Sequence, residues 1–180
     1  MKGIVFVEFI EMVDSQFSVE MSERLIQMSN LPSKGVYTSV GTYNSNEMLT
    51  LLDNLSNLVR IPTGDLLKEF GRHLFKRFLM NFPVFFRGIN SAFEFLSRVE
   101  KVVHLEVRKL YQDAELPTFV STFPKPDRLH LKYQSSRNLP DLAEGLILAC
   151  IDHYKERLSV ERQNLEEDPP ATLFVISSER

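Results

Sequence analysis

The sequence predicts an α+β fold, with a helical N-terminal lobe followed by a C-terminal lobe that combines an antiparallel sheet with helices. Three observations support this prediction. Apolar residues recur every three or four positions through most of the first 111 residues, which is typical of amphipathic helices. After Pro117 the period changes to two, which is typical of strands. Hydrophobic residues make up 43% of the 180-residue chain, so the fold can enclose a sizeable core.

Five helices are expected before Pro117, and capping residues mark several of their ends. Asn44 or Ser45 can cap one helix, and Ser91 can cap a long one, because short polar side chains accept hydrogen bonds from free amides of the first turn. Pro62 can open another, since proline is tolerated in a first turn. The expected helices span residues 3–17, 19–29, 45–59, 63–80 and 91–111.

Strands and one helix are expected after Pro117. Pro124 to Asp127 should form the turn between the first two strands, because proline and aspartate favour turns. The expected elements are strands over residues 118–123, 128–133, 158–165 and 172–176 and a helix over residues 139–155. We expect one domain, residues 1–180, made of a helical subdomain of about residues 1–62 and an α/β subdomain of about residues 63–180.

Composition and missing motifs exclude several classes of protein. The net charge of −3 gives no electrostatic basis for binding nucleic acid. Cys150 is the only cysteine, which excludes an internal disulfide and fits a reducing cytoplasm. Glu8 and Glu11 interrupt the apolar start, which we interpret as a buried helix rather than a signal peptide, and no stretch reaches the length of a membrane span. No catalytic triad, phosphate loop or zinc-protease pattern occurs. We therefore expect a cytoplasmic protein that is not an enzyme and binds neither nucleic acid nor membrane.

His104 is the first candidate site residue. It falls on the flank of the apolar stripe of the helix expected over residues 91–111, at the edge of a buried zone. An imidazole there can bind a metal, and axial ligation of heme needs only one such residue. A lone histidine at such a position is more often a core residue with its hydrogen bonds satisfied. The position alone leaves both interpretations open.

Tyr133, Ser135 and Arg137 form the second candidate group. Residues two apart in a strand point to the same side, so the spacing places two hydroxyls beside a guanidinium. Such a set binds carboxylate or phosphate, although a solvated strand face would look the same. We expect this strand at the edge of the sheet, leading into a helix whose Gly145 suggests a close approach to a flat molecule or to another helix.

Together the two groups can hold a molecule with a metal at its centre and carboxylates at its edge, and heme is such a molecule. Pro117 is a third candidate. It can be an ordinary proline that ends a helix, or a rigid wedge against a cofactor. The sequence alone does not separate these two roles.

The chain resembles the heme nitric oxide/oxygen binding (H-NOX) family, in its stand-alone bacterial type, which is related to the heme domain of soluble guanylate cyclase. The resemblance covers nearly the whole chain, and it depends on the order and spacing of several short motifs. These are Met1-Lys2-Gly3-Ile4, Phe70-Gly71-Arg72, His104 to Tyr111, Ala114 to Pro117, Tyr133-x-Ser135-x-Arg137, and Ala143 to Leu146.

The resemblance implies that heme b is buried between the two lobes. His104 would be the proximal iron ligand, and Pro117 would bend the porphyrin. Tyr133, Ser135 and Arg137 would bind the propionates. The positions implied for the distal pocket and for heme packing are Val5, Phe9, Leu74, Phe78, Leu142 and Leu146.

Departures from the family pattern indicate which gas is bound. Members that hold dioxygen place a tyrosine five residues after the motif arginine, and Leu142 stands there in this chain. Phe9 and Leu74 are apolar where supporting polar residues would lie. Dioxygen on ferrous heme develops charge that needs a hydrogen-bond donor, so we expect selection of nitric oxide, and weakly of carbon monoxide, over dioxygen. His73 neighbours Leu74 and should face elsewhere, because helical neighbours point about 100° apart. With Cys150 alone, no structural zinc is expected.

By resemblance, the chain is a nitric oxide sensor that signals through release of His104 from the iron. The partner would be a separate histidine kinase or cyclic-di-GMP enzyme. Two alternatives stay open at this point. One is a heme-dependent dioxygen-binding or heme-carrier protein, and the other is an interaction domain that kept the fold without the cofactor.

Overall fold

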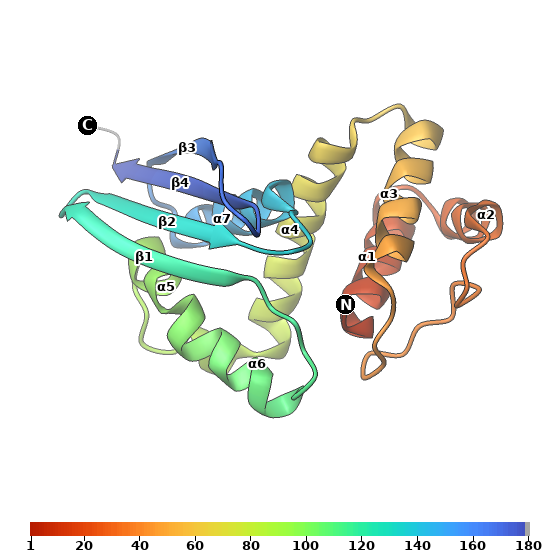
Figure 1. Ribbon diagram of the computed structural model, residues 1–180, viewed down its shortest axis with the longest axis horizontal. Helices are drawn as coiled ribbons and strands as arrows, with labels where there is room; N and C mark the ends of the chain where they lie inside the picture. The colour runs from red at the N-terminus through yellow and green to blue at the C-terminus, as the bar shows by residue number, and fades with distance from the viewer. Residues whose placement is uncertain (179–180) are drawn as a thin grey trace.

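The computed structural model describes residues 1–178, and it confirms the predicted α+β class (Figure 1). Helices α1–α3 form one lobe, and a four-stranded antiparallel sheet with α5–α7 forms the other, with α4 between them. The helices are α1 Gly3–Gln16, α2 Val19–Ser29, α3 Ser45–Val59, α4 Thr63–Asn81, α5 Ala92–Arg98, α6 His104–Leu110 and α7 Pro140–Tyr154. The strands are β1 Thr118–Lys125, β2 Arg128–Gln134, β3 Leu158–Leu165 and β4 Ala171–Ser178.

Side-chain caps fix the starts of several helices, as the sequence predicted. Asn44, rather than Ser45, caps α3, because its side chain accepts a hydrogen bond from the Asn46 amide. Ser91 caps α5 by accepting from the Glu94 amide at 3.1 Å. Such caps supply partners for amides that have none within the helix. A short 3₁₀ turn, Pro83–Phe86, follows α4.

The helix expected over residues 91–111 is continuous from Ala92 to Leu110, but its middle is not α-helical. Val99–Val103 forms a π-helical segment between α5 and α6, in which the His104 amide bonds the Val99 carbonyl. Such segments are rare and frequently lie at functional sites. The predicted position of His104 on the flank of the apolar stripe requires an unbroken α-helix with 100° per residue. A π turn shifts the helical phase, so this spacing does not hold across it.

The strand order in the sheet is β1-β2-β4-β3, with antiparallel neighbours throughout. The expectation that the Tyr133 strand lies at the edge is wrong: β2 pairs with both β1 and β4, and β1 and β3 are the edges. Long-range pairing of β4, which follows β2 by 36 residues, places β2 inside the sheet, and local sequence cannot show that. The predicted turn is also shorter, because β1 continues to Lys125 beyond an irregularity after Thr122.

Two hydrophobic cores meet along α4 and α7. One is enclosed by α1–α4, and the other lies between the sheet and α5 and α7. Leu74 of α4 packs in the first core, while the next residue, Phe75, packs in the second. In β2, Leu129, Leu131 and Tyr133 alternate inward to the second core, which brings Tyr133 toward the junction of the lobes.

Glycines allow α4 and α7 to approach closely. A Cβ atom placed at Gly145 would lie 2.1 Å from the Lys68 carbonyl oxygen, and one at Gly71 would lie 2.4 Å from the Leu142 carbonyl oxygen. The close approach expected at Gly145 is therefore that of another helix.

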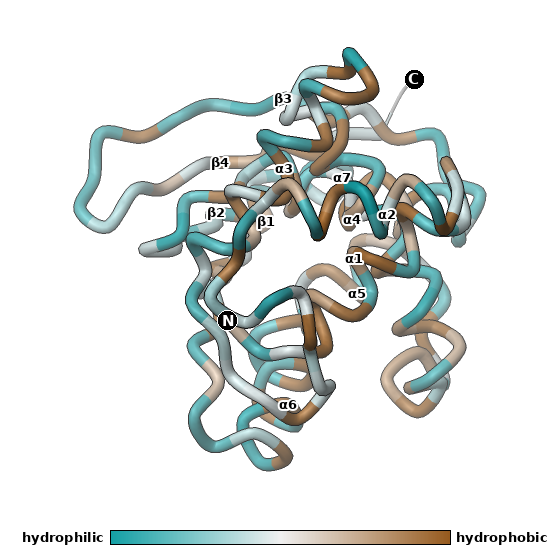
Figure 2. Tube along the Cα trace, turned by 90° about the vertical axis from the view of Figure 1, so that its right-hand side faces the viewer, coloured by the Kyte–Doolittle hydropathy of each residue, from teal (hydrophilic) through white to brown (hydrophobic). Residues whose placement is uncertain are grey.

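The start of the chain links the two lobes. Figure 2 shows the N-terminus in the region between β1 and α6. The Lys2 Nζ donates to both carboxylate oxygens of Asp113 at 3.1 and 3.2 Å, and the Thr42 hydroxyl donates to Asp113 at 2.6 Å. Asp113 lies three residues after the end of α6, so this cluster connects the helical lobe with the loop beyond His104.

Candidate functional site: an apolar cavity with one imidazole

A cavity of about 280 Å³ lies between the lobes and is lined by residues from both. Its wall is mainly apolar, with several phenylalanines from α4, α5 and the 3₁₀ turn. The structure brings ten of the eleven site residues expected from the sequence to this one cavity. They are Val5, Leu74, Phe78, His104, Pro117, Tyr133, Ser135, Arg137, Leu142 and Leu146.

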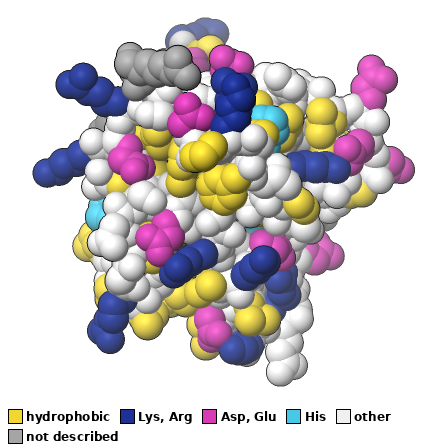
Figure 3. Space-filling model, turned by 90° about the vertical axis from the view of Figure 1, so that its left-hand side faces the viewer, with side chains coloured by type: hydrophobic (Ala, Val, Ile, Leu, Met, Phe, Trp, Pro, Cys, Tyr) yellow, Lys and Arg dark blue, Asp and Glu magenta, His cyan; other side chains and the backbone are white. Residues whose placement is uncertain are grey.

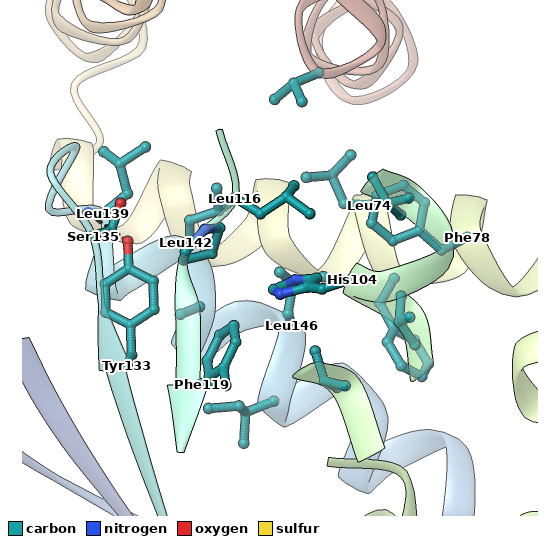
Figure 4. A pocket seen from close by; sticks show the side chains of 18 of the residues that line it. Leu74, Phe78, His104, Leu116, Phe119, Tyr133, Ser135, Leu139, Leu142 and Leu146 are labelled. Carbon is teal, nitrogen blue, oxygen red and sulfur yellow. Dashed lines mark hydrogen bonds between the residues drawn. The ribbon is translucent and has the colours of Figure 1, made fainter. Parts of the chain in front are cut away.

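His104 contributes an imidazole ring to the wall of this cavity. It projects from the first residue of α6 toward Leu142 and Leu146 of α7 (Figure 4). Its side chain is only 12% exposed, and its ring lies 5.6 Å from that of Phe119, centroid to centroid. Burial lowers the pKa of His104 below its usual value, against the opposing effect of Glu100, so the ring is neutral at pH 7. A neutral imidazole is the form that binds a metal.

The carboxylate of Glu100 forms a hydrogen bond with the ring nitrogen Nδ1 of His104. One Glu100 oxygen lies 2.9 Å from this nitrogen and also accepts from the Phe119 amide at 3.1 Å. The other oxygen accepts from Arg108 at 2.8 Å. Burial by itself would raise the pKa of Glu100, but hydrogen bonds from Arg108, His104 and the Phe119 amide together lower it. Glu100 is therefore an ionised carboxylate that faces the imidazole.

Tyr133, Ser135 and Arg137 gather at one end of the cavity, but only Tyr133 lies in a strand. Strand β2 ends at Gln134, and the other two residues belong to the turn that leads to α7. The Ser135 Oγ accepts from the Arg137 amide at 3.2 Å, and the Tyr133 hydroxyl accepts from the Leu139 amide at 3.1 Å. The turn thus places the three side chains together, and strand alternation does not.

Arg137 pairs with Glu115 across the cavity mouth. Its guanidinium donates to the Glu115 carbonyl at 2.5 Å and to the Glu115 carboxylate at 2.7 Å. Arg137 is 15% exposed at its side chain, whereas Glu115 is 79% exposed. A surface ion pair of this kind contributes little free energy, about 0–1 kcal/mol, so a ligand carboxylate can replace Glu115 at Arg137.

Among the described residues, those that α1, α4 and α7 contribute to the cavity wall are all apolar. Phe9, expected at the distal pocket or in heme packing, does not line the cavity; it is fully buried beside Phe70 in the core of the helical lobe. His73 faces away from the cavity, as expected. Its Nε2 lies 3.1 Å from the buried Glu8 carboxylate, which Arg77 also binds at 2.7 Å.

Several residues in or beside the cavity were missed from the sequence. Glu100 carried a usable signal, because residues four apart on a helix are neighbours. Phe82, Phe85 and Phe86 follow α4 and line the cavity, but nothing in their local pattern distinguishes them from core residues. The Glu115–Arg137 pair joins residues 22 apart, and no sequence rule predicts it.

The donor set fits heme. A single neutral imidazole in an apolar cavity suits one axial position of an iron, and the apolar walls suit a flat macrocycle. Arg137, with the hydroxyls of Tyr133 and Ser135 beside it, suits carboxylates at the edge of that macrocycle. Pro117 also lines the cavity. The residue before it, Leu116, points into the cavity (Figure 4).

Comparisons with known proteins agree with this description. The family model described as Haem-NO-binding matches residues 2–162. An H-NOX protein from K. algicida, solved in the Fe(II) unliganded state, is 37% identical, with a TM-score of 0.92; the alignment covers 100% of this chain and 97% of that one. A comparison with curated proteins yields no match.

Two further solved structures carry gases at their iron. The H-NOX protein from Shewanella woodyi, in the Fe(II)CO state with IWP-051 bound, is 33% identical, with a TM-score of 0.85, over 99% of this chain and 95% of that one. The H-NOX protein from S. oneidensis in the Fe(II)NO state is 23% identical, with a TM-score of 0.90, over 100% of both chains, and this likeness shows the fold.

Proposed function

The chain belongs to the Haem-NO-binding family, whose members are heme-based sensors rather than catalysts, and we propose that it binds nitric oxide and signals to a separate enzyme. The observation that carries the proposal is His104, a single imidazole that projects into an apolar cavity with Arg137 at one end. A cytoplasmic location is part of the proposal, since it fits the buried free thiol of Cys150.

Each expected residue has a role in this proposal. Heme b supplies, when bound, an iron that accepts one axial protein ligand and one gas molecule. His104 is the axial ligand, and Tyr133, Ser135 and Arg137 bind the propionates. Pro117 presses on the macrocycle as a rigid wedge. The side chains proposed to pack against the heme or the gas are Val5, Leu74, Phe78, Leu142 and Leu146.

The apolar wall supports selection of the gas. Leu142, Leu74 and Phe78 offer no hydrogen-bond donor to a bound gas, and His73 is engaged by Glu8. Bound dioxygen needs a donor for its developing charge, and an apolar wall penalises that charge. Nitric oxide, and more weakly carbon monoxide, are therefore the ligands that we propose. The relatives from S. oneidensis and Shewanella woodyi carry nitric oxide and carbon monoxide, respectively.

Release of His104 is the proposed signal. His104 begins α6, and Asp113 beyond α6 is bound to Lys2 and Thr42 of the helical lobe. A shift of α6 would therefore reach the helical lobe through this cluster. We treat residues 1–62 and residues 63–180 as the two subdomains that move relative to each other. The gas can bias this equilibrium only because it favours the released state.

The proposed partner is a histidine kinase or a cyclic-di-GMP enzyme, by analogy with stand-alone members of the family. Either partner would bind the helical lobe or α6 and would change its activity when nitric oxide shifts that element.

Absorption spectra of the purified, dithionite-reduced protein test the proposal. After reductant removal, we expect a spectrum of five-coordinate ferrous heme that does not change in air and shifts when nitric oxide is added. A stable dioxygen spectrum would instead favour the alternative function, a dioxygen-binding or heme-carrier protein. A protein that shows no Soret band after heme addition would leave the cofactor-free interaction domain.

A further inference from the structure

Glu100 occupies a central position beside the candidate iron ligand. It lies in the π-helical segment, and its carboxylate touches three partners from different places: His104 at the start of α6, Arg108 one turn further, and the Phe119 amide of β1. The Glu100 side chain is 26% exposed, and the His104 side chain is 12% exposed. The imidazole is therefore the more sheltered of the two groups, and the carboxylate is partly open to water.

The geometry fixes which ring nitrogen carries the hydrogen. A carboxylate accepts hydrogen bonds and cannot donate them, so the Nδ1 of His104 must be the protonated nitrogen at 2.9 Å from Glu100. The lone pair of the neutral ring is then on Nε2, which is the nitrogen left for a metal. A carboxylate in this place also makes the imidazole a stronger electron donor.

We propose that Glu100 is a positioning residue that sets the strength of the His104–iron bond, and that Arg108 moderates its effect. The inference rests on the proposed function, because it requires His104 to ligate the iron. Hydrogen bonds to ionised acceptors are roughly twice as strong as neutral ones, so the charge of Glu100 decides the effect. Arg108 lies 2.8 Å from the other oxygen and draws part of that charge away from the ring.

The consequence concerns the threshold of the sensor. A stronger His104–iron bond resists the release that nitric oxide causes, and a weaker one gives way sooner. Glu100 and Arg108 would thus adjust the response from outside the cavity, since neither side chain lines it. Partners of this kind typically change metal affinity by roughly 10–100-fold.

The test is the iron–histidine stretching band in resonance Raman spectra of the reduced holoprotein without gas. Glu100→Gln keeps the shape and the acceptor oxygen but removes the charge, so the band should move to lower frequency. Arg108→Met leaves Glu100 in place and fully charged toward His104, so the band should move to higher frequency. Glu106→Gln is the matched control: Glu106 lies on α6 and pairs with Lys109 at 2.6 Å, and its loss should leave the band in place.

Stopped-flow spectra add a second measurement. After nitric oxide binds, His104 should leave the iron roughly ten-fold faster or more in Glu100→Gln than in the unchanged protein. If Glu100→Gln fails to take up heme, the upward shift in Arg108→Met still decides the question.

Two different failures can be told apart. A band that is present in the unchanged protein and stays at the same frequency in both Glu100→Gln and Arg108→Met would overturn the role of Glu100 alone. A reduced, heme-loaded protein with no iron–histidine band would contradict ligation by His104, and so would overturn the proposed function together with this inference.

Discussion

In the proposed function, Leu142 is the residue that most directly determines which gas the heme binds. It lies on α7, and its side chain enters the cavity beside His104 (Figure 4). In the sequence, Leu142 stands where dioxygen-binding members have a tyrosine. The resemblance to the family also predicted its place in the cavity wall. The sequence also predicted an apolar wall, and the structure adds that every lining residue from α1, α4 and α7 is apolar.

Replacing Leu142 by tyrosine should create a dioxygen complex. A hydroxyl that donates to a charged acceptor contributes about 1.5–3 kcal/mol, which corresponds to roughly 10–100-fold in affinity. We expect the reduced Leu142→Tyr protein to show a dioxygen spectrum in air. Leu142→Phe supplies a ring of similar size without the hydroxyl, and it should behave like the unchanged protein. A dioxygen spectrum in both variants would mean that space, and not the donor, controls binding.

Single residues also show which parts of the site the sequence can predict and which it cannot. His104, Tyr133, Ser135 and Arg137 all reach the cavity, as expected from motif spacing. Phe9 does not, because the turn of α1 that carries it faces the core around Phe70. A motif position identifies the helix that carries a residue, whereas the packing of that helix decides which of its faces the cavity meets.

At the scale of elements, the helices were predicted closely because their caps and periodicity are local. The π-helical segment Val99–Val103 was not predicted, since its valines and charged residues fit an α-helix equally well. The interior position of β2 was also missed, because strand order depends on the pairing of β2 with the distant β4. Ser135 and Arg137 reach the site through a turn, which the alternation of a strand did not anticipate.

The contact of α4 with α7 gives a test at this scale. Helix propensity alone predicts that Gly145→Ala stabilises the protein by about 1 kcal/mol. The new methyl group would meet the Lys68 backbone, and such overpacking typically costs about 1–3 kcal/mol, so we expect a net loss. The midpoint of thermal unfolding of the holoprotein should fall by roughly 2–4 °C per kcal/mol lost.

Gly64→Ala is the control for this prediction. A Cβ there would come no closer than 3.3 Å to the side-chain carboxylate of Asp141, which has to shift by only a few tenths of an ångström, so the midpoint should stay or rise. A Gly145→Ala protein that unfolds at the same temperature as Gly64→Ala would show that the two helices separate at little cost.

At the scale of the whole molecule, two cores share α4, and the cavity lies where they meet. None of the helices in residues 1–178 combines the length and apolar character that crossing a bilayer requires. On the face shown in Figure 3, acidic and basic side chains are interspersed with hydrophobic ones, with no broad area of one charge. Such a mixed surface gives no electrostatic attraction for nucleic acid on that face.

In the proposed function, the bond between His104 and the iron controls the relative position of the two lobes. His104 connects the cavity to α6, and Asp113 connects the loop after α6 to Lys2 and Thr42. The link through Asp113 is partly exposed, since the Asp113 side chain is 60% exposed. A weak link of this kind suits a two-state change, because small differences in free energy can shift its population.

Electron paramagnetic resonance of the reduced protein under nitric oxide tests the central claim, release of His104, most directly. If the gas displaces His104, the signal will show hyperfine splitting from the nitric oxide nitrogen alone. Additional splitting from a second nitrogen, persisting at saturating nitric oxide, would mean that His104 stays on the iron and would contradict the account.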